Sequence, residues 1–91
     1  MDIEWIRRQV KSEDYLWTYH ADEERRNDRL EISTVEAALV KGKILERYPN
    51  DPRGISCLVY GEAENVPIHV ICGKNKADRL VIITGLQTNF T

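Results

Sequence analysis

Apolar positions in the N-terminal half of the chain recur with the period of helices. Ile3, Ile6 and Val10 lie at the i, i+3, i+7 spacing that produces one apolar stripe, so a helix is predicted over residues 3–11. Residues 20–29 are nearly devoid of apolar side chains, and they favour a solvated helix that is stabilised by ion pairs. Aromatic residues at alternate positions between the two helices favour a short extended segment. They are Tyr15, Trp17 and Tyr19.

A third helix, over residues 34–41, has the clearest end signals in the sequence. Ser33 is predicted as its N-cap, and Glu36 three residues later completes a capping box. At the other end, Gly42 is predicted to close the helix in the left-handed conformation, which glycine adopts at little cost. Helical structure is therefore expected to end near Lys41.

After Gly42 the apolar pattern changes to that of strands. The predicted strands cover residues 44–48, 55–61, 68–73 and 80–84. The loops between them are short, which favours antiparallel neighbours over crossover connections. The sequence thus predicts an α+β fold in which N-terminal helices pack on a four-stranded antiparallel sheet ordered as a meander. With 91 residues, the chain has room for one core and is predicted to form a single domain over residues 1–91.

The last three predicted strands are apolar on both faces, because apolar residues fill many of the positions between the alternating ones. The helices can cover only one face of such a sheet. We expect the aromatic segment, a partner protein or self-association to shield the other, since soluble proteins rarely expose a large apolar patch.

Composition and charge narrow the functional classes. The content of 42% hydrophobic and 31% charged residues is typical of a globular protein, and no window approaches the roughly eighteen apolar residues of a membrane span. Residues 1–4 lack the basic and apolar regions of a secretory signal, so a cytoplasmic protein without membrane contact is expected. A net charge of −2 argues against a general nucleic-acid coat. Any contact with RNA is expected to be local.

The two cysteines, Cys57 and Cys72, lie in apolar runs where free cysteine behaves as a small hydrophobic residue. We predict that both are reduced, since nothing in the sequence indicates an oxidising compartment. The close ligand pairs of a zinc site, such as Cys-x-x-Cys, are absent. No metal and no cofactor are expected.

Six ordered blocks carry a resemblance to a known family. They are Tyr19-His20-Ala21-Asp22-Glu23-Glu24-Arg25, Val35-Glu36-Ala37-Ala38-Leu39, Ile44-Leu45-Glu46-Arg47-Tyr48-Pro49, Arg53-Gly54-Ile55-Ser56-Cys57-Leu58, Pro67-Ile68-His69-Val70-Ile71-Cys72-Gly73 and Val81-Ile82-Ile83-Thr84. Together they resemble the bacterial family catalogued as domain of unknown function 4258, over nearly the whole chain. The resemblance implies a fold related to RelE/ParE-type toxins and a gene neighbour that is often a zinc-finger antitoxin. In that family Thr-x-Tyr and then Pro usually end the final strand, whereas here Leu86 stands at the tyrosine position.

His20 and His69 are the only histidines and the candidate proton carriers for metal-free RNA cleavage, which needs a general base and a general acid. Glu24, four residues after His20, could orient its ring and raise its pKa. Alternatively, His20 bonds the backbone at a helix start while Glu24 is solvated. His69 is expected on the sheet face opposite Ile68 and Val70, where it is either catalytic or a satisfied sheet residue.

Arg25 and Arg53 are the candidate phosphate clamps, because a guanidinium offers planar paired donors to phosphate oxygens. Arg53 lies in a turn beside Gly54, where backbone amides can help to hold an anion. The alternative for Arg53 is an exposed ion pair with Asp51. If a cleavage site exists, both arginines and both histidines are expected to converge on one concave surface.

The sequence is therefore consistent with two functional classes. The first is a metal-independent endoribonuclease-like toxin of a bacterial toxin–antitoxin pair, whose partners are RNA and an antitoxin protein; the histidines, arginines and family resemblance favour it. The second is a non-catalytic interaction module that binds a partner through the sheet face or edge. The acidic pI of about 5.7 and the absent terminal tyrosine favour the second.

Overall fold

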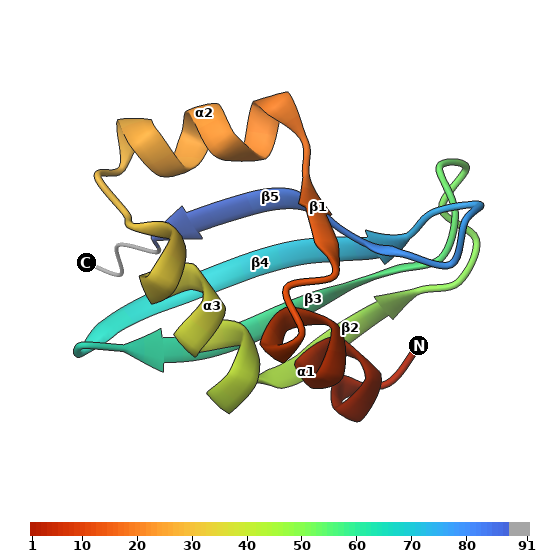
Figure 1. Ribbon diagram of the computed structural model, residues 1–91, viewed down its shortest axis with the longest axis horizontal. Coiled ribbons are helices and arrows are strands. Elements are labelled where there is room, and N and C mark those ends of the chain that lie inside the picture. The colour runs from red at the N-terminus through yellow and green to blue at the C-terminus, as the bar shows by residue number, and fades with distance from the viewer. Residues whose placement is uncertain (88–91) are drawn as a thin grey trace.

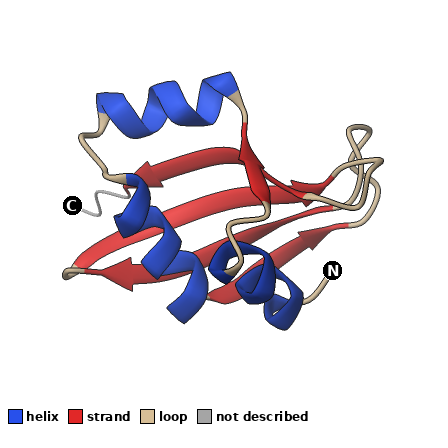
Figure 2. Ribbon diagram, viewed as in Figure 1, coloured by secondary structure: helices blue, strands red, loops and turns tan. Residues whose placement is uncertain are grey.

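The computed structural model describes residues 1–87, and within them side chains up to residue 85. This part of the chain forms three helices and one five-stranded sheet (Figures 1 and 2). The elements are α1 (Ile3–Lys11), β1 (Tyr15–Trp17), α2 (Tyr19–Asn27), α3 (Ile32–Lys41), β2 (Lys43–Tyr48), β3 (Ser56–Ala63), β4 (Val66–Lys74) and β5 (Leu80–Gln87). The α+β class is confirmed, and each predicted helix and strand is present with ends that differ by a few residues. None of the described helices has the length and apolar character needed to cross a membrane.

The sheet has the order β1-β5-β4-β3-β2 and is mixed, so the prediction of four antiparallel strands is wrong. Strands β2 to β5 form the predicted antiparallel meander. The fifth strand is β1, which pairs with β5 in parallel, Tyr15 opposite Leu80 and Trp17 opposite Ile82. Because the helices α2 and α3 and three strands separate β1 from β5 along the chain, no local signal could reveal this pairing. The aromatic segment thus extends the sheet and leaves its second face uncovered.

One face of the sheet carries α1 and α3, while α2 runs alongside β5 at the upper edge (Figure 1). Side chains at alternate strand positions meet the apolar stripes of the helices and form the core. Its fully buried members include Ile6, Val35, Leu39, Val59, Ile68, Val70, Leu80 and Ile82. The opposite face has no helix on it in the described part of the chain.

The first residue of a helix was predicted correctly for α1 but not for α3. Helix α1 begins as the spacing predicts, and the Asp2 carboxylate caps it by accepting a hydrogen bond of 2.8 Å from the Trp5 backbone N–H. Helix α3 begins at Ile32, ahead of the predicted Ser33 cap, and its N-cap position is Glu31 without a side-chain capping bond. The capping-box prediction is therefore wrong. Glu36 instead accepts a hydrogen bond from the Tyr15 hydroxyl, and this contact joins α3 to β1.

Gly42 ends α3 in an extended conformation, with φ −81° and ψ −176°, so the predicted left-handed cap is also wrong. The glycine is needed for space. A Cβ at this position would lie 2.5 Å from the carbonyl oxygens of Ala38 and Tyr60. Gly61 on β3 has the same role, since its Cβ would lie 2.1 Å from the Ala38 oxygen. Two glycines thus allow α3 to lie closely on β3.

The hydrogen bonds of the Tyr15 hydroxyl predict how the stability of the fold changes at alkaline pH. It donates to Glu36 Oε2 at 2.6 Å and accepts from Trp17 Nε1 at 3.3 Å. The pKa of Tyr15 is raised from 10.0 to about 12, mainly by burial and further by the hydrogen bond to Glu36. Because the folded state holds this proton more tightly than the unfolded state, the stabilising contribution is complete below pH 10.0 and is lost as the pH rises to about 12.

Urea unfolding between roughly pH 9 and pH 12 checks this prediction when the parent is compared with Tyr15→Phe. The parent is expected to lose more stability over this range than the variant, which lacks the titrating group. Equal losses in the two proteins would show that other groups account for the alkaline effect.

Candidate functional site

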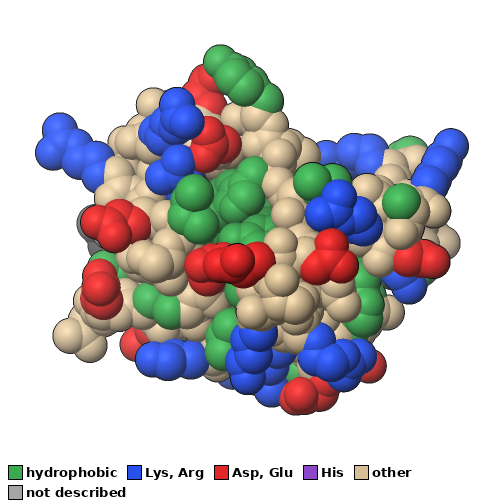
Figure 3. Space-filling model, viewed as in Figure 1, with side chains coloured by type: hydrophobic (Ala, Val, Ile, Leu, Met, Phe, Trp, Pro, Cys, Tyr) green, Lys and Arg blue, Asp and Glu red, His purple; other side chains and the backbone are tan. Residues whose placement is uncertain are grey.

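The uncovered face of the sheet combines apolar, aromatic and titratable side chains. Ile68 and Val70 are buried in the core, and His69 between them points to the opposite face and is half-buried, as the alternation predicted. Half-buried Leu58 and Ile71 lie opposite each other on the same face. Figure 3 shows the helix-bearing side, where acidic and basic side chains surround an apolar centre and neither histidine is visible.

His69 forms an aromatic pair with Tyr60, its register partner on β3. The ring centroids are 5.0 Å apart and the planes are tilted by 57°, a favourable geometry for two aromatic rings. The Tyr60 hydroxyl donates to Glu62 at 3.0 Å. This bond raises the pKa of Tyr60. The pair thus places two aromatic rings side by side on the open face of the sheet.

His20 and Glu24 lie together on α2, as their four-residue spacing indicated. The His20 Nε2 atom is 3.1 Å from Glu24 Oε1, a distance typical of an ion pair when the ring is protonated. The alignment does not meet hydrogen-bond geometry, so the buried Oε1 atom has no hydrogen-bond partner within the described residues. His20 is 71% exposed, whereas Glu24 is 20% exposed. Thr18 caps the helix by accepting from the Ala21 backbone N–H, so His20 does not serve that purpose.

Arg25 is held by contacts that pack α2 against the rest of the fold. Its guanidinium donates twice to Asp22, at 3.1 and 2.6 Å, and once to the Leu30 carbonyl at 2.9 Å. It also lies 5.8 Å from the centre of the Trp17 ring. With a side chain only 13% exposed, Arg25 is part of the packing of α2 and not an open cation.

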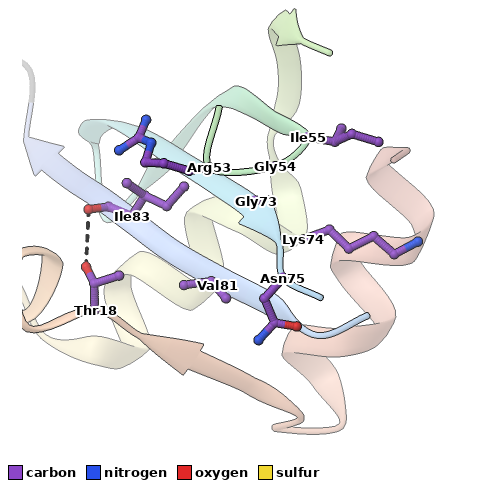
Figure 4. Close-up of a pocket in the computed structure, with 9 residues that line it drawn as sticks. All are labelled: Thr18, Arg53, Gly54, Ile55, Gly73, Lys74, Asn75, Val81 and Ile83. Carbon is purple, nitrogen blue, oxygen red and sulfur yellow. Dashed lines mark hydrogen bonds between the residues drawn. The ribbon is translucent and has the colours of Figure 1, made fainter. Parts of the chain in front are cut away.

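Arg53 lines a cavity of about 220 Å³ at one end of the sheet (Figure 4). The cavity lies among the loop before β3, the β4–β5 turn and the N-cap of α2. Thr18 borders it and donates a hydrogen bond of 3.3 Å to the Ile83 carbonyl, while Ile83 and Val81 form its apolar wall. Neither histidine nor Arg25 lines this cavity.

Asp51 fixes the Arg53 side chain. The Arg53 Nε and Nη2 atoms donate to the two Asp51 oxygens at 3.1 and 3.0 Å, and the Arg53 backbone N–H donates at 2.9 Å. The Ser56 hydroxyl donates to the same carboxylate at 2.9 Å. These hydrogen bonds hold the pKa of Asp51 well below its usual range, and those from the Arg53 side chain contribute most. The ion pair considered from the sequence is therefore present, and Arg53 borders a cavity as well.

Sequence reasoning missed two polar residues of this cavity, Thr18 and Asn75. The Asn75 side-chain oxygen accepts from the backbone N–H groups of Ala77 and Arg79, so it organises the β4–β5 turn. A threonine just before a helix and an asparagine in a turn are recognisable local signals. Lys74 also borders the cavity, but its ammonium extends away from Arg53 (Figure 4) and lies 5.3 Å from the Trp5 ring centre.

The fold and this site define a small α+β domain with one helix-covered sheet face, one open face and an arginine-bordered cavity at the sheet end. A family model described as Domain of unknown function (DUF4258) matches residues 17–84, and the chain belongs to this family. Helix α1 lies outside the matched segment. Comparisons with curated proteins and with solved structures found no match. The side chain of Leu86, at the family's tyrosine position, lies outside the described residues.

Proposed function

We propose that this chain is the toxin of a bacterial toxin–antitoxin pair and cleaves RNA without a metal ion, with Arg53 as the phosphate-binding residue. The observation that carries this proposal is the Arg53 cavity, which combines a fixed guanidinium with polar and apolar walls at the end of the open sheet face. The relation to RelE/ParE-type toxins that the family resemblance implies is part of the same proposal.

Arg53 has donors to spare for a phosphate. A guanidinium has five N–H donors, and Asp51 accepts from two of them within the described part of the chain. The remaining donors lie on a side chain that is 64% exposed and is held in one orientation. Because Asp51 is itself held by Ser56, it keeps the guanidinium in place when an anion approaches. This arrangement favours local binding of one phosphate over general attraction to nucleic acid.

His20 is the candidate general base. Thr18 borders the cavity, and His20 follows it by two residues, so their Cα atoms are within about 8 Å of each other. The Glu24 carboxylate at 3.1 Å would stabilise the imidazolium that forms when His20 takes the proton of a 2′-hydroxyl. In the proposed step, the resulting 2′-oxygen attacks the adjacent phosphorus and the 5′-oxygen leaves.

His69 and Tyr60 are the candidates for the remaining tasks on the open face. Their paired rings provide a surface on which an unpaired base can stack. His69 lies four residues along β4 from Gly73, which lines the cavity, and four strand residues span about 13 Å. Its proposed role is therefore to hold a neighbouring nucleotide by stacking, while water supplies the proton that the leaving 5′-oxygen takes.

A non-catalytic interaction module is the second candidate function, and the apolar character of the open face favours it. Leu58 and Ile71 are half-buried there without a helix above them in the described chain. Strand β2 is an edge strand with Leu45 46% exposed, so its backbone can pair with a strand of another protein.

RNA cleavage by the purified chain tests the proposal. We expect cleavage of a single-stranded RNA in the presence of excess EDTA, with 2′,3′-cyclic phosphate ends, because the 2′-oxygen is the nucleophile. A matched oligonucleotide with 2′-deoxy sugars at the cleaved positions is the control and is expected to remain intact. Expression of the chain in bacteria without an antitoxin is expected to arrest growth. Intact RNA together with normal growth would exclude the toxin and leave the interaction module.

A further inference from the structure

Cys57 and Cys72 are directly opposite each other on neighbouring antiparallel strands, β3 and β4. Their Sγ atoms are 3.9 Å apart, and both residues are at most 1% exposed. Residues opposite each other in antiparallel strands have Cα atoms about 4.5 to 5.5 Å apart, which is within the range that a disulfide spans. A small rotation of the side chains would bring the sulfur atoms to bonding distance without separating the strands.

A second cavity, of about 210 Å³, leads to one of these two cysteines. Its lining includes Cys57 together with Met1, Arg47, Pro49 and Ile55, but not Cys72. Arg47 is the register partner of Cys57 on β2, so its cationic side chain is next to the cysteine at the edge of the sheet. A small molecule can therefore approach Cys57 from the β2 side, while Cys72 lies behind it in the core.

The surroundings of the two sulfur atoms also favour Cys57 as the more reactive cysteine. The hydrogen bond between the two thiols lowers the pKa of Cys57, and the positive charge of Arg47 lowers it further. For Cys72, the hydrogen bond with Cys57 and then burial raise the pKa. Since the thiolate is the nucleophilic form of cysteine, both the cavity and the lower pKa favour Cys57 over Cys72 as the sulfur that reacts first.

We propose that Cys57 is a modification site for small hydroperoxides such as hydrogen peroxide, and that Cys72 then closes a disulfide between β3 and β4. In the first step, the Cys57 thiolate attacks a peroxide oxygen, an S–O bond forms, the O–O bond breaks and hydroxide leaves. Sulfur is oxidised by two electrons and the peroxide is reduced. In the second step, Cys72 attacks the Cys57 sulfur, the S–S bond forms, and the oxygen leaves with the thiol proton as water.

The reduced pair is the resting state in this proposal, and the disulfide forms only on exposure to peroxide. The bond would tie β3 to β4 three register positions away from the Tyr60–His69 pair on the same two strands. This inference does not depend on RNA cleavage, because its readout is covalent chemistry of the two sulfur atoms.

Mass spectrometry of the reduced full-length chain, treated with hydrogen peroxide under native conditions, tests the site. Trypsin places both cysteines in one peptide, residues 54–74, because no Lys or Arg lies between Arg53 and Lys74. We expect this peptide to lose two hydrogens in mass and to resist alkylation until reductant is added. Cleavage after Glu62 or Glu64 then separates the cysteines only in reduced samples, which identifies the linkage.

Variants distinguish the attacking from the resolving cysteine. Cys72→Ala is expected to accumulate a sulfenic acid on Cys57 that dimedone traps, whereas Cys57→Ala is expected to leave Cys72 unmodified. Arg47→Gln is expected to slow the reaction several-fold, and Arg47→Lys, which retains the charge, to restore most of the rate. Excess dimedone added to the parent during oxidation locates the first modified sulfur even when an alanine variant fails to fold.

Three results would overturn the proposal. The first is full retention of both thiols at a peroxide dose that oxidises free cysteine. The second is trapping of the sulfenic acid on Cys72, and the third is a disulfide between two chains with none inside one chain.

Discussion

Replacing Gly61 by alanine is expected to destabilise the fold by about 3 kcal/mol or more, because the added methyl group has no space. Its Cβ would lie 2.1 Å from the Ala38 carbonyl oxygen and 2.8 Å from the Ala38 carbonyl carbon. Both atoms belong to the backbone of α3, so no side chain can rotate away. The helix must move off β3, and the contacts that bury Val35 and Leu39 loosen with it.

Thermal and urea unfolding measure this effect. For a domain of this size, the stated loss corresponds to a fall in Tm of roughly 12 to 24 °C. Gly85→Ala is the matched control, since Gly85 is also a buried strand glycine. Among the described residues, its Cβ would meet only the Trp17 and Val35 side chains, at 3.9 and 4.0 Å, which are ordinary contacts. A change within about 1 kcal/mol is expected there. Similar losses in both variants would show that the approach of α3 to β3 does not require Gly61.

The elements that sequence predicted well are those fixed by neighbours along the chain. Helix α1 has the predicted bounds because its apolar stripe and its Asp2 cap are local. The meander from β2 to β5 follows from short loops and alternating apolar residues. The start of α3 was predicted wrongly because the first helical hydrogen bonds run from the Thr34 and Val35 backbone N–H groups to the Glu31 carbonyl, so the helix begins before Ser33. Strand β1 depends on a partner more than sixty residues away, as the pairing of Tyr15 with Leu80 shows.

In the candidate site, too, contacts between near neighbours in the sequence could be predicted, whereas contacts between distant segments could not. The His20–Glu24 contact spans one helical turn, and its spacing indicated it. The pairing of Arg53 with Asp51 is equally local. Arg25 is held by hydrogen bonds to Asp22 and Leu30, which are only three and five residues away, and the sequence analysis did not consider them. Only its contact with Trp17 depends on the distant pairing of β1 with β5. The cavity beside Arg53 also combines three separate segments of the chain, so no spacing rule could have found it.

Replacing Arg53 by alanine is expected to lower the rate of RNA cleavage by about 10² to 10³-fold, if the guanidinium binds the reacting phosphate as proposed. The fold should remain intact, because the Arg53 side chain is 64% exposed and an exposed ion pair contributes little stability. Arg53→Lys is expected to recover only part of the rate, since an ammonium supplies charge but not the planar paired donors. Cleavage under single-turnover conditions and RNA affinity at two salt concentrations are the measurements.

Arg26→Ala is the matched control for Arg53→Ala, because both changes remove one positive charge from an exposed ion pair. The Arg26 guanidinium is 71% exposed and pairs with Asp22 at 2.9 Å on α2, and it does not border the Arg53 cavity. Its loss is expected to weaken RNA binding slightly through the change in net charge and to leave the cleavage rate nearly unchanged. Equal effects of the two variants would mean that charge alone matters and that Arg53 holds no particular phosphate. A parent rate retained in folded Arg53→Ala would remove the cavity from the mechanism, and the open sheet face would then be better explained as a surface for a protein partner.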